Sequence, residues 1–162
     1  MRTTWTKQTV GVACAAICAI VLCSATGAQP DPLVGTWRLD VARSTYKPGP
    51  APRGQIVVIE AAGKGIKVSV HTVAADGTEV KWGYSSARDG KDAPVTNNPN
   101  YDTASATQTS PTVGTILFKK SGKTIVTVKT AVSKDGKRLT ATYTGVNADG
   151  QPMNNVGVFL KQ

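Results

Sequence analysis

Cysteine is absent from residues 29–162, because the three cysteines of the chain all lie within the first 28 residues, at Cys14, Cys18 and Cys23. Residues 29–162 can therefore form no disulfide, no thiolate metal site and no cysteine nucleophile. Histidine occurs once, at His71, and one histidine cannot supply the three or four protein ligands of a usual zinc site. We expect this part of the chain to be stabilised by burial of apolar side chains alone, with no metal and no cofactor.

The sequence also lacks a catalytic motif. No Gly-x-Ser-x-Gly nucleophile motif is present. Four of the ten acidic residues stand in Asp-Gly pairs, where turn geometry explains them. The remaining carboxylates show neither a pairing that indicates glycoside hydrolysis nor the alternate spacing of a calcium loop. We predict that the protein is not an enzyme, and we interpret His71 as an exposed residue on the polar face of its strand.

One apolar run occurs, over residues 10–23, and it is shorter than the roughly 20 residues of a bilayer-spanning helix. Arg2 and Lys7 precede it, and the small residues Thr26-Gly27-Ala28 follow. This order is typical of a secretory signal peptide. We predict a signal peptide over residues 1–28 and an exported protein that begins near Gln29 and resides in the periplasm or outside the cell.

Residues 29–162 are long enough for one hydrophobic core and too short for two domains. Without Arg2 and Lys7, 17 basic residues face 10 acidic ones, a net charge of +7. Such a charge favours anionic partners, including phospholipid headgroups, lipopolysaccharide phosphates and acidic metabolites. We expect no contact with nucleic acid in an exported protein. The lysines are scattered along the sequence, which more often indicates solubility and protected sheet edges than a binding patch.

Short β-rich runs alternate with turn residues from Leu33 to the end of the chain, and no stretch has a helical period. Asp-Gly recurs four times between these runs, which favours tight hairpins. The proline-rich stretch 44–54 is expected to be an extended connector, and residues 97–102 a loop. We predict a single antiparallel up-and-down barrel of eight to ten strands, with a two-sheet sandwich as the alternative. The strands are expected near residues 34–42, 55–61, 66–74, 78–86, 92–96, 102–109, 112–119, 123–132, 138–145 and 155–161.

Period-two alternation selects the side chains that face the interior of this barrel. The predicted inward set is Trp37, Val57, Val68, Val70, Val80, Trp82, Val126, Val128, Leu139 and Val158. Aromatic side chains with a polar tip commonly line ligand pockets, although a small core also needs them. The candidate ligand-binding residues are Trp37, Trp82, Tyr84 and Tyr143.

The segment 33–39, with its Gly35-Thr36-Trp37 motif, resembles the opening strand of calycins, the lipocalin and fatty-acid-binding superfamily. Residues 33–162 are similar to small secreted bacterial lipocalin-like proteins of unassigned function. The resemblance implies a β-barrel whose first tryptophan closes one end. Lipocalins often place an arginine near the last strand over that tryptophan, and here the nearest basic residue is Lys161. Further segments that carry the likeness are 89–92, 94–96, 132–137 and 154–156.

Two functions remain open from the sequence. A carrier would hold a small apolar or amphipathic ligand inside the barrel. A cell-envelope interaction module would instead have a filled interior and would bind anionic lipid or polysaccharide through its basic outer surface. The strands are rich in valine, threonine and alanine and poor in large aromatics, which favours an enclosed space. The sequence gives no indication of the oligomeric state.

Overall fold

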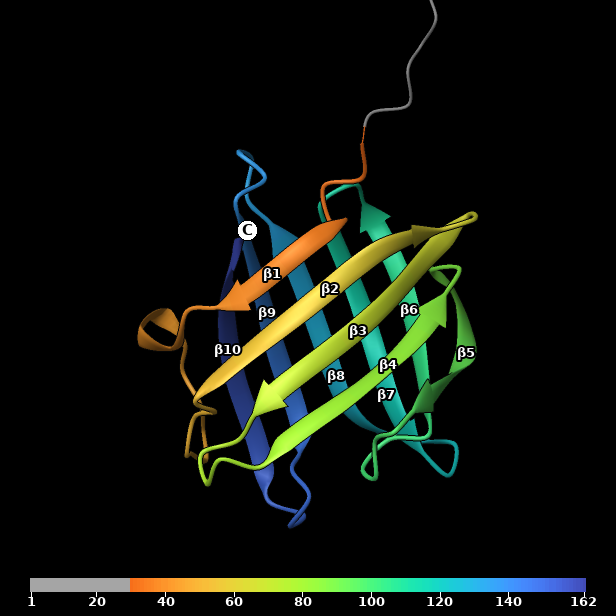
Figure 1. The fold of residues 1–162 in the computed structure, drawn as a ribbon. Helices are drawn as coiled ribbons and strands as arrows, with labels where there is room; N and C mark the ends of the chain where they lie inside the picture. Colours follow the sequence, from red (N-terminus) through yellow and green to blue (C-terminus); the bar gives the residue numbers. More distant parts are fainter. Residues whose placement is uncertain (1–29) are drawn as a thin grey trace, which may run out of the picture.

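A computed structural model describes residues 30–162, which form one closed antiparallel β-barrel (Figure 1). Each strand pairs with its neighbours in the sequence, and the first strand pairs with the last. The predicted all-β, up-and-down barrel is confirmed. The predicted signal peptide lies outside the described residues. The strands are β1 (Gly35–Leu39), β2 (Gly54–Ala62), β3 (Gly65–Val73), β4 (Glu79–Ser86), β5 (Asp89–Thr96), β6 (Thr103–Ser110), β7 (Val113–Lys120), β8 (Lys123–Val132), β9 (Arg138–Val146) and β10 (Pro152–Lys161).

Local turn chemistry explains two of the hairpins directly. In the β3–β4 turn the carboxylate of Asp76 accepts a hydrogen bond from the Thr78 backbone N–H at 2.8 Å. In the β8–β9 turn Asp135 accepts one from the Lys137 N–H at 3.1 Å. Such Asx turns reverse the chain within a few residues. Asp89-Gly90 was predicted to be a hairpin turn of the same kind. Asp89 does accept a hydrogen bond from the Lys91 N–H at 3.1 Å, but the two residues do not form a separate turn between strands.

Asp89 and Gly90 instead open strand β5. The chain reverses just before them, where Arg88 takes a positive φ of 60°. The register between β5 and β6 shifts between Asp89 and Asp92, as in a β-bulge. Glycine is common at bulges as well as at turns, so the dipeptide alone does not separate the two structures.

The interior of the barrel is apolar, and nine of the ten predicted inward residues face it. Val158 is the exception. On β10 the inward positions are Gly157 and Phe159, and Phe159 is only 1% exposed. Val158 and Phe159 are adjacent apolar residues, so alternation can start from either of them. Burying the larger aromatic ring removes more apolar surface from water, which decides the register.

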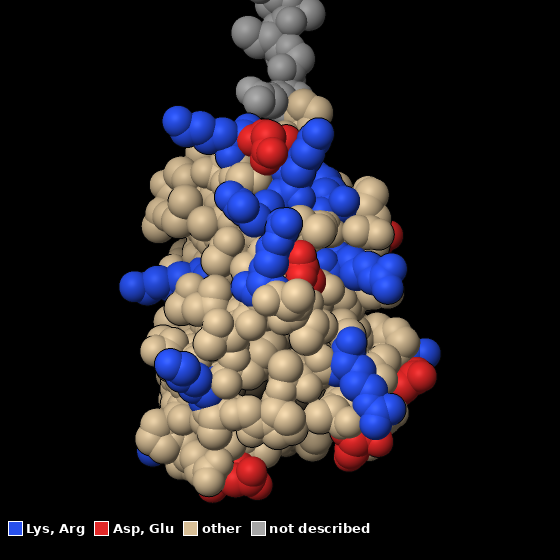
Figure 2. Space-filling view, turned by 90° about the vertical axis from the view of Figure 1, so that its left-hand side faces the viewer, with Lys and Arg blue, Asp and Glu red and all other residues tan. Residues whose placement is uncertain are grey.

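Basic side chains are spread over the outer surface rather than gathered in one patch. Figure 2 shows more of them than acidic ones on the side of the barrel that carries β10, with the highest density in its upper half. Several lysines pair with acids, for example Lys119 with Asp92 at 2.6 Å. No helix within residues 30–162 is long and apolar enough to cross a membrane. The one helical segment among the described residues, η1 (Val41–Arg43), is a single 3-10 turn after β1.

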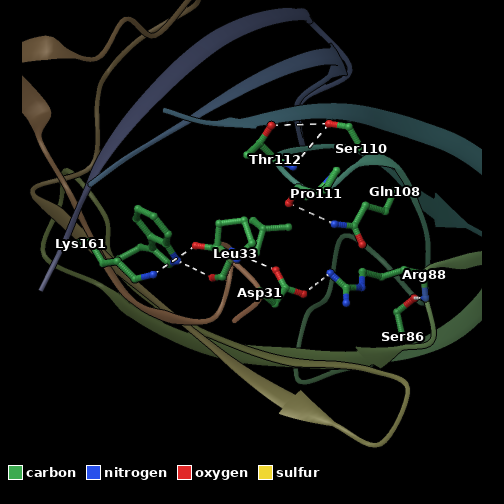
Figure 3. Close-up of polar contacts among 11 residues, drawn as sticks. Asp31, Leu33, Ser86, Arg88, Gln108, Ser110, Pro111, Thr112 and Lys161 are labelled. Carbon is green, nitrogen blue, oxygen red and sulfur yellow. Dashed lines mark hydrogen bonds and ion pairs between the residues drawn. The ribbon is translucent and has the colours of Figure 1, made fainter. Parts of the chain in front are cut away.

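One end of the barrel is closed around Trp37, which is fully buried. Its indole N–H donates a 2.8 Å hydrogen bond to the Leu33 carbonyl. The ammonium of Lys161 lies 5.0 Å from the centre of the indole ring and donates to the Pro32 carbonyl at 3.1 Å (Figure 3). A cation over an indole face is attracted by the ring electrons.

Gly35 makes this closure sterically feasible. A Cβ at this position would meet the side-chain Cε of Lys161 at 2.6 Å, and the φ of Gly35 is +142°. The lysine stem therefore crosses the strand where there is no side chain. The positive φ is the stronger reason for a glycine two residues before Trp37, because other residues rarely adopt it whereas the lysine stem is flexible.

Replacing Trp37 by alanine should lower the free energy of unfolding by about 3–5 kcal/mol, because it empties a fully buried site. Trp82→Ala is the matched control. Trp82 is only partly buried and faces open space in the barrel, so its loss should cost less. Urea denaturation followed by circular dichroism measures both. An equal or larger cost at Trp82 would contradict the assignment of Trp37 as the closing residue.

Candidate functional site

The interior of the barrel contains a cavity of about 740 Å³ that is partly open to solvent. Its walls are the inward side chains of the strands, and several of these are small, among them Ala106, Gly114, Val128 and Ala141. At the end opposite Trp37, the connector between β1 and β2 and the β5–β6 loop also contribute to the lining. Known small-molecule sites have volumes of about 300–1,000 Å³ and are mostly apolar. The cavity is therefore large enough for a small organic ligand.

Four aromatic rings form one wall of the cavity. Tyr101 stacks on Phe118 with ring centres 4.8 Å apart, and Tyr84 meets Phe118 edge-on at 5.9 Å. Trp82 lies 5.5 Å from Phe118 and 6.4 Å from Tyr84. These separations are typical of favourable aromatic pairs. The cluster gives the cavity a rigid wall that suits apolar or planar groups.

The cavity carries little charge. Besides tyrosines, its ionisable lining residues are Asp76 and Arg88. Asp76 lies in the β3–β4 turn at the rim. The guanidinium of Arg88 lies 2.6 Å from the carboxylate of Asp31, in the segment that leads into β1 (Figure 3). The two side chains are only 17% and 22% exposed, so the ion pair joins the N-terminal segment to the β4–β5 turn and the Arg88 charge is already neutralised.

The seam between β4 and β5 is the shortest ladder in the barrel. It has two register pairs, Gly83 with Thr96 and Tyr84 with Val95, whereas β3 and β4 share eight. A second hollow of about 530 Å³ lies beside this seam. Trp82 and Tyr84 line both the hollow and the cavity. The aromatic wall therefore stands next to the least hydrogen-bonded part of the barrel.

Burial raises the pKa of all four tyrosines that line the cavity, Tyr46, Tyr84, Tyr101 and Tyr143. Around Tyr143, the other three phenols add a smaller effect in the same direction. Their hydroxyls therefore stay protonated at neutral pH and can donate hydrogen bonds.

Of the predicted site residues, Trp82, Tyr84 and Tyr143 line the cavity together, whereas Trp37 closes the barrel end and is not part of the lining. Tyr46 and Tyr101 were not identified from the sequence. They lie in the connector and in the β5–β6 loop, where strand alternation gives no orientation. Phe118 was also missed, although its alternation with Ile116 on β7 could have indicated it.

His71 faces outward, as predicted, and its Nε2 lies 2.9 Å from Glu79. Within residues 30–162 no three side chains of histidine, cysteine, aspartate or glutamate are grouped to hold a metal ion. No known protein-family model matches the chain, and no curated protein resembles it.

The raised pKa values of the four cavity tyrosines predict how the stability of the protein changes at alkaline pH. A free tyrosine ionises near pH 10, and the pKa of each cavity tyrosine is raised in the folded protein. The unfolded chain therefore loses its phenol protons first. The contribution of these groups to stability is complete below about pH 10 and declines as the pH rises towards their folded pKa values.

Tyrosinate absorbance and circular dichroism, recorded together during an alkaline titration, check this. Tyrosinate should appear together with unfolding, while the same titration in concentrated urea should give an ordinary curve. Ionisation of all four tyrosines near pH 10 with the barrel still folded would show that the phenols are not shielded from water.

Proposed function

We propose that the protein is an exported carrier, without enzymatic activity, that holds a small apolar or amphipathic ligand inside its barrel. The main observation that supports this function is the apolar cavity of about 740 Å³ with its aromatic wall. The lipocalin-like appearance of the fold supports the same function. Export to the periplasm or beyond rests on the leader pattern of residues 1–28.

The cavity is too large to be a packing defect. Protein interiors are packed about as densely as organic crystals, and empty volume forfeits contacts on every wall. Ten strands make a wider barrel than eight, and small side chains leave the additional width unfilled. An apolar occupant would restore those contacts, so ligand binding and stability should be coupled.

A neutral fluorescent probe, N-phenyl-1-naphthylamine, tests the proposal with two variants of β9. Ala141→Phe places a ring in the cavity and should weaken probe binding about tenfold, because ligand and ring would occupy the same space. Thr142→Phe is the control, since Thr142 is the next residue and faces outward. Its binding should equal that of the original protein.

Native mass spectrometry of protein purified from its own cells provides a second readout, in which a co-purifying molecule should be displaced by the probe. The carrier is refuted if the probe does not bind, or if Ala141→Phe binds it unchanged.

A row of side chains on the outer surface favours a second candidate, a module that binds anionic envelope lipid or polysaccharide. Ile56, Arg38, Leu160 and Arg138 are register neighbours across β2, β1, β10 and β9. All four are exposed, and Ile56 and Leu160 are large apolar residues at 40% and 37% exposure. Neither arginine has an ion-pair partner within residues 30–162. Alternating apolar and basic groups suit an anionic lipid surface.

Vesicle binding tests this second candidate. The protein should bind vesicles that contain phosphatidylglycerol, but not pure phosphatidylcholine, and salt should release it. Arg38→Gln with Arg138→Gln should abolish binding, while Lys123→Gln with Lys129→Gln, which removes the same charge from β8, should retain most of it. Equal losses in both variants would show that net charge acts alone and that the row is not a site.

A further inference from the structure

All four tyrosines of the chain line the cavity, and they come from four separate segments. Tyr84 lies on β4 and Tyr143 on β9, while Tyr46 comes from the connector and Tyr101 from the β5–β6 loop. No other part of the described chain holds a tyrosine.

None of the four hydroxyls takes part in a hydrogen bond within residues 30–162, where the side-chain bonds involve other groups. The hydroxyls are also absent from the fully buried polar atoms that lack a partner, so each retains surface that faces open space. A partly buried hydroxyl normally finds a hydrogen-bond partner. These phenols are therefore available to donate to a molecule in the cavity.

The four phenols line the same cavity. Tyr84 and Tyr101 both pack on the ring of Phe118. Tyr143 lies on the β9 side of the cavity, with Val128 as its register neighbour on β8, and Val128 is in turn the neighbour of Ile116 on β7. The polar donors thus lie on more than one side of the apolar space.

The described lining of the cavity offers no free basic side chain that could pair with a buried anionic ligand. Its one cation, Arg88, is already paired with Asp31. Moving an ionised carboxylate into apolar surroundings without a counter-charge is costly. Neutral phenols can satisfy the oxygen of an ester, ketone or ether at far lower cost, because the acceptor carries no charge to desolvate.

We infer that the cavity selects uncharged amphipathic ligands, with an apolar body along the aromatic wall and an oxygen acceptor held by the tyrosine hydroxyls, in preference to fatty-acid anions. This inference rests on the proposed carrier function and specifies its ligand class. It assigns Tyr84 and Tyr143, together with Tyr46 and Tyr101, as the polar contacts of the ligand.

The inference can be tested at neutral pH by measuring how well three matched alkyl compounds displace N-phenyl-1-naphthylamine from the protein. Methyl laurate has the acceptor without charge, laurate has the charge, and dodecane has neither. Methyl laurate should bind at least about tenfold more tightly than laurate or dodecane. Lowering the pH until the carboxyl group protonates should strengthen laurate binding towards that of the ester.

Tyrosine variants locate the contact. Tyr84→Phe and Tyr143→Phe keep the rings and remove the hydroxyls, so methyl laurate should lose about three- to tenfold in affinity for each hydrogen bond removed. Dodecane and the fluorescent probe should bind as before. Thr142→Val, which removes a hydroxyl from the outer face of β9, is the control and should change nothing.

The outcomes separate the two proposals. If the probe binds but laurate equals its ester, or if the phenylalanine variants keep full ester affinity, the ligand class is wrong and the carrier stands. If the probe does not bind the original protein, both the ligand class and the carrier function are refuted. The ester-to-acid preference of the unmodified protein is independent of whether the variants fold.

Discussion

The pairing of β1 with β10 is the interaction on which the rest of the structure depends. It has only three register pairs, yet it joins the two ends of the folded chain and turns an open sheet into a barrel. An open sheet without disulfides would otherwise expose two hydrogen-bonding edges. Trp37 and Lys161, partners in this register, reinforce the pairing, because the indole is buried and the lysine lies over it. Gly35 gives the lysine room to do so.

Closure with ten strands also creates the interior space. The strands carry many small side chains, and four of the large rings gather on one wall, so the barrel is closed but not filled. Besides the β1–β10 pairing, the β4–β5 seam is also a short ladder, with two register pairs, and it lies next to that wall. The molecule thus combines a firmly sealed end at Trp37 with a weakly bonded side at Trp82 and Tyr84. A carrier needs both a retained ligand and a part of the wall that can open.

Much of the fold could be predicted from the sequence because two local rules agree along most of the chain. Alternation of apolar residues and recurrent turn residues located the strands and nine inward side chains. They failed where the pattern is ambiguous: at Val158 and Phe159, which are adjacent and both apolar, and at Asp89-Gly90, where a bulge and a turn share the same residues. Tyr46 and Tyr101 could not be placed, because loops have no period and only the closed barrel brings them to the cavity.

The central claim is that the barrel holds a ligand in its interior. A crystal structure of residues 29–162 with a bromine-labelled neutral ester tests this most directly, since anomalous scattering locates the bromine without bias from the protein. The account predicts a bromine inside the barrel beside Trp82, with the ester oxygen within hydrogen-bond distance of a tyrosine hydroxyl. A barrel whose interior is filled by its own side chains, or a bromine found only on the outer surface, would contradict it.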